Sequence, residues 1–331
     1  MTPPSETMRP FGPRVWSRGG HAQTLLGFLA RRSLRWSLPQ EDLVVPSGDG
    51  IPLLVRATYQ EGPRQARPLL VLLHGLGGTD ASGYLVATAL LAHARGYHVY
   101  RMNMRGAGDS LPLSGRLYNA GQDKDLLAVL ERAAQESGKV FLAGFSLGAS
   151  LALLALGRLR DRLPRALRAA AGVSPPLDLR ACALALERVS NRPYQVYFMR
   201  ALRRGYRALQ SRAPGEFEAG IEDRAHTVFE FDDLITARYG GYGSAEDYYA
   251  RSSAGPWLRH IVHPTLILAA KDDPMIPSAS LEAFEDSPAT NREILGTGGH
   301  VGFVAPTSAP GSFWAAERVL GFLDAYGDKE R

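Results

Sequence analysis

The sequence predicts an α/β fold in which a mostly parallel sheet is covered by helices on both faces. Short, continuously apolar segments such as 69–73 and 264–270 are typical of strands that are buried on both faces. Segments with helical periodicity alternate with these strands along most of the chain. The sequence Gly-Phe-Ser-Leu-Gly at 144–148 falls between a predicted strand and a predicted helix, where a G-x-S-x-G turn is expected.

The order of these patterns gives the individual elements. Residues 43–45 and 51–56 flank Ser-Gly-Asp-Gly at 47–50, a composition typical of a turn, and are predicted to form a hairpin. Further strands and helices then alternate. The predicted strands are 69–73, 97–102, 140–143, 167–173, 264–270 and 293–295, and the predicted helices are 82–95, 121–136, 147–159, 278–285 and 312–326.

One long segment interrupts this alternation, because residues 175–257 are mostly helical in pattern. We therefore predict one catalytic domain, formed by 41–174 and 258–331, with 175–257 inserted as a helical cap. The first 40 residues are rich in proline, arginine and glycine and show no clear periodicity. We expect 1–40 to pack on the domain as an extension. The sequence leaves the oligomeric state open.

The composition excludes several classes of protein. The chain has 331 residues, of which 45% are hydrophobic and 21% charged, so it is neither disordered nor fibrous. The single cysteine, Cys182, excludes an intrachain disulfide. No apolar segment approaches the ~20 residues of a membrane-spanning helix, and the N-terminus lacks the apolar core of a signal peptide. We therefore expect a soluble, cytoplasmic protein.

The net charge of +5 is concentrated in one part of the chain. Residues 180–212 contain eight arginines and a single acidic residue, a net +7, so the remainder is slightly acidic and no nucleic-acid partner is expected. Four of the arginines share one face of a predicted helix: Arg200, Arg203, Arg204 and Arg207. This face is either solvated or in peripheral contact with an anionic membrane.

The G-x-S-x-G turn identifies a candidate nucleophile. A sharp turn from strand to helix raises the Ser146 hydroxyl above the edge of the sheet and points a helix N-terminus at a developing oxyanion. A serine hydroxyl also needs a base, and chains with this turn place the acid and then the histidine later in the sequence. A tight turn with a chance serine is the alternative.

The C-terminal part of the chain offers both partners in that order. Asp272 and Asp273 follow the predicted strand 264–270, and His300 lies in a glycine-flanked loop after the last predicted strand. We prefer Asp273 as the acid because Pro277 follows it with the D-x-x-x-P spacing common after this strand in such enzymes. Asp272 would then support the site or cap a helix. A polar turn and an ordinary loop histidine are the alternatives.

Two backbone N–H groups are expected to form an oxyanion hole. One belongs to Leu147, directly after the candidate nucleophile, and the other to Leu76 in His-Gly-Leu-Gly-Gly at 74–78. A phosphate-binding turn is the alternative, but the glycine spacing fits neither a dinucleotide-binding nor a P-loop motif. We find no H-x-x-x-H motif or cysteine pair, so no metal or organic cofactor is expected.

Together these motifs resemble those of the α/β-hydrolase superfamily from about residue 40 onward. Gly-His-Ala-Gln-Thr at 20–24 is similar to the H-x-Q-T signature of the YheT-like hydrolases, a branch that includes plant embryogenesis-associated and animal and yeast abhydrolase proteins. Glu-Phe-Asp at 230–232 and Asp-Tyr-Tyr at 247–249 are similar to the cap motif of this branch.

The resemblance implies a Ser-Asp-His esterase, with the triad on Ser146, Asp273 and His300. Relatives act on medium-chain acyl esters, as phospholipases or as acyl transfer enzymes. We therefore predict hydrolysis of a small-molecule carboxylic ester, with a short- to medium-chain acyl group or a lipid ester as substrate, through an acyl-enzyme intermediate. An acyltransferase, a phospholipase-like lipid hydrolase and a non-catalytic binding protein are the alternatives. The resemblance assigns no role to His21-Ala22-Gln23-Thr24, which packs against the cap, lines the site entrance or is purely structural.

Overall fold

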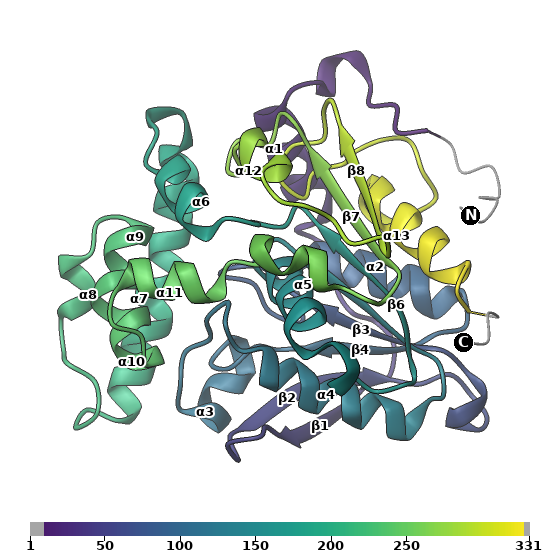
Figure 1. The fold of residues 1–331 in the computed structure, drawn as a ribbon, viewed down its shortest axis with the longest axis horizontal. Helices are drawn as coiled ribbons and strands as arrows, with labels where there is room; N and C mark the ends of the chain where they lie inside the picture. Colours follow the sequence, from purple (N-terminus) through teal and green to yellow (C-terminus); the bar gives the residue numbers. More distant parts are fainter. Residues whose placement is uncertain (1–9, 328–331) are drawn as a thin grey trace.

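The computed structural model describes residues 10–327 and contains one eight-stranded sheet in that range (Figure 1). The strand order is β1-β2-β4-β3-β5-β6-β7-β8. Every neighbouring pair from β4 to β8 is parallel, whereas the first two pairs are antiparallel. The predicted α/β class with a mostly parallel sheet is therefore confirmed. The strands are β1 (Glu41–Pro46), β2 (Pro52–Thr58), β3 (Leu69–Leu73), β4 (His98–Met102), β5 (Val140–Phe145), β6 (Leu167–Val173), β7 (Thr265–Ala270) and β8 (Thr290–Leu295).

Helices cover both faces of the sheet. α2 (Gly83–Ala94) and α13 (Trp314–Asp324) pack on one face, and α4 (Asp123–Glu136) and α5 (Leu147–Leu159) pack on the other. Successive side chains of a strand point to opposite faces, so Leu70 and Leu72 join the core beneath α13 while Val71 joins the core beneath α5. Both cores need apolar side chains, which is why β3 is continuously apolar.

The last strand and two helices differ in extent from the predictions. β8 begins at residue 290 rather than 293, because its first residues are polar and only half buried at the edge of the sheet and so carry no apolar pattern. α12 (Ser278–Glu282) and α13 are shorter than the predicted helices 278–285 and 312–326.

The segment between β6 and β7 is helical and lies to one side of the sheet (Figure 1). Its helices share an apolar core that includes Phe198, Tyr206, Phe217 and Phe231. The division of the chain into a catalytic domain and a cap stays a prediction. The helices of this segment are α6 (Leu179–Leu186), α7 (Arg192–Arg212), α8 (Ile221–Arg224), α9 (Val228–Phe231), α10 (Arg238–Gly240) and α11 (Ala245–Ser252). The short helix α3 (Leu111–Ser114) lies outside this segment, between β4 and α4 in the chain.

The N-terminal extension contains a helix that we did not predict, α1 (Gly20–Arg31). Its buried residues include Gln23, Thr24 and Arg31, whereas Leu25 and Phe28 are exposed. The usual pattern of an amphipathic helix is reversed here, so hydrophobic periodicity did not indicate its position. Residues 1–9 of the extension lie outside the described residues. Among the described helices, none is both long and apolar enough to cross a membrane.

Candidate active site

Ser146 lies at the turn between β5 and α5 and has an unusual backbone conformation. Its φ is +53° and its ψ is −122°, which is rare for a residue other than glycine and costs roughly 1–3 kcal/mol. The two glycines of the motif allow the close packing of this turn. A Cβ on Gly144 would lie 2.3 Å from the carbonyl oxygen of Gly148, and one on Gly148 would lie 2.4 Å from that of His74. The turn therefore requires glycine at both positions.

The structure brings Ser146, His300 and Asp273 together from the ends of three strands. The Nε2 of His300 lies 2.8 Å from the Oγ of Ser146, and its Nδ1 lies 2.8 Å from the Oδ2 of Asp273. A carboxylate only accepts hydrogen bonds, so Nδ1 donates to Asp273 and Nε2 of the neutral ring accepts from the Ser146 hydroxyl. This is the arrangement in which an imidazole can take the hydroxyl proton.

The two neighbouring aspartates have different contacts. Asp273 is buried, and its second oxygen accepts from the backbone N–H groups of Met275 at 2.8 Å and Ile276 at 3.1 Å. Asp272 accepts instead from the Thr297 hydroxyl at 2.6 Å and the Gly299 N–H at 3.0 Å. Asp273 thus faces the imidazole, whereas Asp272 holds the loop that precedes it.

The two residues predicted to form the oxyanion hole, Leu76 and Leu147, line a cavity together with Ser146 and His300. The N–H groups of Gly75 and Gly77 donate to the hydroxyls of Tyr84 and Tyr118, and that of Gly78 donates to the Gly75 carbonyl. The N–H groups of Leu76 and Leu147 have no hydrogen-bond partner among the described residues. The group on Leu147 is also one of the first N–H groups of α5, which have no partner within a helix.

His74 joins two loops at the same edge of the sheet, a role that the sequence analysis did not foresee. Its Nε2 accepts from the backbone N–H of Met104 at 3.1 Å, so its Nδ1 carries the proton and donates to the Gly75 carbonyl at 2.8 Å. Complete burial lowers the pKa of His74 to about 4. The ring is therefore neutral at pH 7 and holds the loop of Leu76 in place.

Helix α1 holds the loop of His300 from the outside. The Thr24 hydroxyl accepts a hydrogen bond from the His300 backbone N–H at 2.9 Å. The Arg31 guanidinium donates to the carbonyls of Val301 at 2.6 Å and Gly302 at 3.0 Å. No residue of this helix other than those of the 20–24 block was singled out from the sequence, because hydrogen bonds to backbone carbonyls leave no sequence signature.

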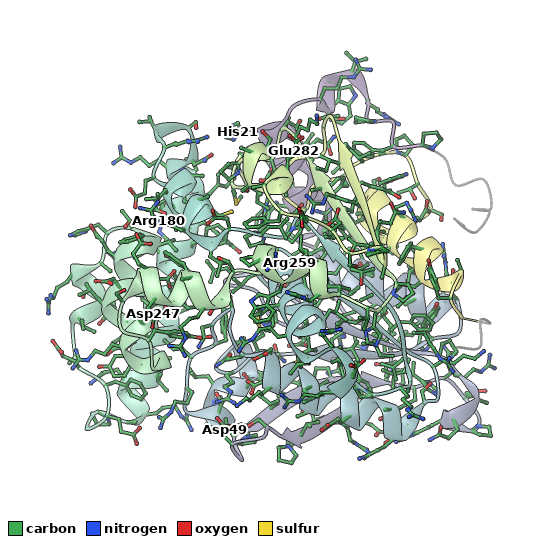
Figure 2. All side chains as sticks on the ribbon, in the orientation of Figure 1. His21, Asp49, Arg180, Asp247, Arg259 and Glu282 are labelled. Carbon is green, nitrogen blue, oxygen red and sulfur yellow. The ribbon has the colours of Figure 1, made fainter. Side chains whose placement is uncertain are left out.

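Other residues of α1 complete these contacts. The Gln23 amide accepts from the Val304 N–H at 2.6 Å and donates to the Val304 carbonyl at 3.2 Å. His21, which is labelled in Figure 2, contacts the inserted segment instead. Its Nδ1 lies 3.0 Å from the Tyr194 hydroxyl, and the two rings are stacked. The His21 to Thr24 block thus both packs against the inserted segment and holds the loop of His300. Burial lowers the pKa of Arg31 to about 9.

Two cavities meet at Ser146 and His300. The larger has a volume of about 440 Å³ and lies between α1, the loop after β3 and the start of α7. Its lining is mainly apolar and includes Leu25, Phe28, Tyr84, Tyr194, Tyr197 and Phe198. The smaller cavity, of about 90 Å³, lies beneath the inserted segment and combines apolar residues such as Leu179 and Ala183 with Asp232 and Tyr249.

Asp232 is the carboxylate in the lining of the smaller cavity, and it belongs to the Glu-Phe-Asp motif noted in the sequence. It accepts from the hydroxyls of Thr236 at 2.7 Å and Tyr249 at 2.8 Å. Burial nevertheless raises the pKa of Asp232 to about 6. The hydrogen bond from the Tyr249 hydroxyl to Asp232 thus joins the two motifs at 230–232 and 247–249.

The four arginines on α7 do not share one environment. Arg203 donates to the backbone carbonyls of Glu222 at 3.1 Å and Ala225 at 2.6 Å, and Arg207 pairs with the carboxylates of Glu222 and Asp223. Arg200 and Arg204 are exposed. Contact of the four with an anionic membrane stays a prediction, and two of them are already engaged by the inserted segment itself.

Comparison with known proteins identifies the family. The model of the family described as the alpha/beta hydrolase fold matches residues 68–305. The chain is 33% identical to the putative esterase YheT of Escherichia coli, over 92% of this chain and 90% of YheT. The chain belongs to the α/β-hydrolase family, in its YheT-like branch. The predicted α/β-hydrolase fold and the resemblance to this branch are thereby confirmed.

Two further similar proteins extend the comparison. A monoacylglycerol lipase of Saccharomyces cerevisiae is 30% identical over 80% of this chain and 60% of the lipase. The solved structure of the Pyrococcus furiosus esterase Pf2001 has a TM-score of 0.58 at 14% identity, over 89% of this chain and 97% of the esterase chain. Within residues 10–327, no group of three or more His, Cys, Asp or Glu side chains is arranged to hold a metal ion.

Proposed function

We propose that this α/β hydrolase cleaves carboxylic esters through an acyl-enzyme intermediate on Ser146. One observation carries the proposal, namely that a single imidazole lies 2.8 Å from both the Ser146 hydroxyl and the Asp273 carboxylate. The names of the relatives support the same class, since YheT is a putative esterase and the yeast relative a monoacylglycerol lipase.

In the proposed first step, His300 takes the Ser146 proton as the serine oxygen attacks the ester carbonyl carbon. Asp273 keeps the proton on Nδ1 and stabilises the imidazolium that forms. The negative charge on the carbonyl oxygen is stabilised by the N–H groups of Leu76 and Leu147 and by the N-terminus of α5. His300 then gives its proton to the departing alcohol, which leaves the acyl group on Ser146.

The second step repeats this chemistry with water. His300 takes a proton from a water molecule as the water oxygen attacks the acyl carbon, and Ser146 leaves with that proton. An acyltransferase would use the same intermediate with an alcohol in place of water, and a phospholipase would use it on a lipid ester. Both alternatives would use the same residues as the esterase. They differ from it only in the acyl acceptor or in the ester that binds.

The cavities suggest which part of an ester binds on each side of Ser146. The larger cavity, with its apolar lining and volume of about 440 Å³, is in the size range of small-molecule sites and suits a short- to medium-chain acyl group. The smaller cavity, with Asp232 and Tyr249 in its lining, suits a compact alcohol group. We place the reaction in the cytoplasm as part of the same proposal.

A fluorophosphonate probe tests the proposal because it reacts with a serine only where a base activates the hydroxyl. The wild-type protein should be labelled and Ser146→Ala should not. Ser150→Ala is the matched control, since Ser150 lies one turn further along α5 and its buried hydroxyl donates to the Pro176 carbonyl at 2.8 Å. This control should be labelled like the wild type. Absence of labelling in the wild type, or labelling of Ser146→Ala, would contradict the proposal.

A further inference from the structure

The exposed face of α1 is apolar. Leu25, Phe28 and Leu29 expose 51%, 53% and 49% of their surface. They recur at the spacing that places residues on one side of a helix. The opposite side of α1, with Gln23, Thr24 and Arg31, is buried against the protein. A surface helix normally buries its apolar side, and an exposed apolar patch on a protein marks a site of interaction.

Helix α7 extends this apolar patch, because side chains of α7 continue it beside α1. Tyr197 is 50% exposed and contacts Phe28 edge to face, with the ring centroids 6.2 Å apart. Val196 beside it is 39% exposed. We call the surface formed by Leu25, Phe28, Leu29, Val196 and Tyr197 the apolar rim.

The apolar rim borders the larger cavity. Leu25, Phe28 and Tyr197 belong both to the rim and to the lining of that cavity. The cavity ends at Ser146 and His300, so a molecule that leaves an apolar phase at the rim meets apolar side chains on its way to the serine. A rim placed elsewhere on the surface would have no such continuity.

The two chain segments that carry the rim bear charge of one sign. Residues 10–40 contain five arginines and no acidic residue, and residues 188–212 contain seven arginines and no acidic residue. Arg32 lies next to the rim in the cavity lining, and Arg200 and Arg204 follow Tyr197 at helical spacing on α7 and are exposed. A positively charged border around an apolar centre complements a surface of apolar chains with anionic headgroups.

We propose that the apolar rim docks the protein on an anionic lipid surface, with the larger cavity opening toward the lipid. The rim supplies the apolar contact, Tyr197 supplies an aromatic ring of the kind found at membrane–water interfaces, and Arg200 and Arg204 contact headgroups. A second copy of the chain is a poorer partner, because two such surfaces would bring like charges together. The docking is reversible, since only the side chains of the rim enter the lipid.

Co-sedimentation with vesicles tests this docking without any turnover, so its result is independent of the proposed function. The wild-type protein should bind vesicles of phosphatidylcholine with phosphatidylglycerol and bind pure phosphatidylcholine much more weakly. Leu29→Asp should weaken binding at least tenfold, because a leucine no longer enters the lipid and a negative charge faces the headgroups. Leu29 is suitable because it lies outside the cavity lining.

Matched variants separate docking from general effects of substitution. Leu113→Asp changes a leucine of similar exposure, 41%, in α3 and should bind like the wild type. Arg200→Gln with Arg204→Gln should weaken binding to the anionic vesicles about ten- to thirtyfold at low salt. Arg162→Gln with Arg165→Gln, two exposed arginines after α5, should have no such effect.

Three outcomes would overturn the proposal. One is a wild-type protein that binds neither kind of vesicle. Another is equal binding by Leu29→Asp and Leu113→Asp. The third is a concentration-dependent dimer in sedimentation velocity that Leu29→Asp abolishes, which would assign the rim to a second copy of the chain.

Discussion

Replacing Thr24 with valine should lower kcat of the proposed hydrolase by about one to two orders of magnitude and leave KM nearly unchanged. The Thr24 hydroxyl accepts the His300 backbone N–H at 2.9 Å. Valine has the same shape and no acceptor, so this N–H loses its partner in the native loop. An N–H left without a partner costs about 1–3 kcal/mol, and the loop avoids that cost by moving the N–H toward water.

The movement of the loop sets the size of the effect. His300 must keep its Nε2 beside the Ser146 hydroxyl, which lies 2.8 Å away in the native loop. A cost of about 1–3 kcal/mol reduces the fraction of molecules in that geometry by about five- to 150-fold. The adjoining Val301 already has a φ of +50°, so the loop has strain to release once the hydrogen bond is lost. The chemical step is affected more than substrate binding, since the imidazole acts only in that step.

Two further variants make this prediction specific. Thr24→Ser keeps the oxygen and should retain most of kcat. Thr88→Val removes another buried threonine hydroxyl, which donates to the Tyr84 carbonyl at 2.8 Å just as the Thr24 hydroxyl donates to the Gly20 carbonyl at 2.7 Å. Thr88 lies in α2 and has no hydrogen bond to the His300 loop among the contacts of the described residues, so its replacement should leave kcat within about threefold of the wild type.

The assay is steady-state hydrolysis of p-nitrophenyl esters, together with the rate of fluorophosphonate labelling of Ser146 and the Tm of each variant. Both rates should fall in Thr24→Val and stay high in Thr24→Ser. Equal values of kcat in Thr24→Val and Thr88→Val would refute the reasoning, because the loss would then follow from any missing hydroxyl. A fall in Thr24→Ser as large as that in Thr24→Val would refute it as well.

The remaining predictions concern the acid, a buried histidine and the two cavities. Asp273→Asn should lower kcat roughly a thousandfold or more, because the imidazole loses the partner that fixes its tautomer. Asp272→Asn should lower kcat far less, because Asp272 contacts the Gly299 N–H and not the imidazole. Ester hydrolysis at pH 8 compares the two variants, and equal losses of kcat would contradict the geometry. His74 has a pKa lowered to about 4 from 6.5, so as the pH falls below 6.5 the unfolded chain binds this proton before the folded protein does. Its contribution to stability is complete above pH 6.5 and falls by roughly 3 kcal/mol toward pH 4. Urea unfolding at both pH values should show a smaller decrease in His74→Gln, and an equal decrease would mean that this imidazole is not the cause. Ala81→Trp, in the larger cavity, should shift the preference of the enzyme toward shorter acyl chains in a p-nitrophenyl ester series. Ala183→Phe, in the smaller cavity, should instead alter the choice of alcohol group. The reverse pattern would exchange the two assignments.

The fold and the members of the candidate site could be predicted because each depends on a local pattern. Continuous apolar segments such as β3 and β7 indicate buried parallel strands, and parallel strands bring their C-terminal ends to one edge of a sheet. Ser146 and His300 are 154 residues apart and meet because both follow such strands. The choice between Asp272 and Asp273 depended only on the distance to a proline, and the structure places Asp273 next to the imidazole.

Other features depend on contacts that no local pattern indicates. α1 was not predicted, because its buried residues are polar and its exposed residues apolar. Arg31 and His74 act on backbone carbonyl and N–H groups, which every residue carries, so nothing in the sequence marks their partners. The α7 arginines form one stripe in the sequence, yet Arg203 and Arg207 find carbonyl and carboxylate partners that only the folded inserted segment supplies.

The two faces of α1 have different physical origins. Its inner face packs against backbone, with a Cβ on Gly27 lying only 2.9 Å from the Gly302 Cα, and the carbonyls of Val301 and Gly302 need donors there. An apolar inner face would leave these carbonyls without partners at about 1–3 kcal/mol each, so polar residues must point inward. No such requirement places leucine and phenylalanine outside, where lysine or glutamate would serve a solvated helix better. The larger cavity accounts for Leu25 and Phe28, which line it, whereas Leu29 lies outside that lining and would gain an apolar partner only in the proposed docking. The inner face of α1 carries Thr24, which contacts the loop of His300, and the outer face carries the rim. A lipid surface at the rim would therefore lie one helix diameter from that loop.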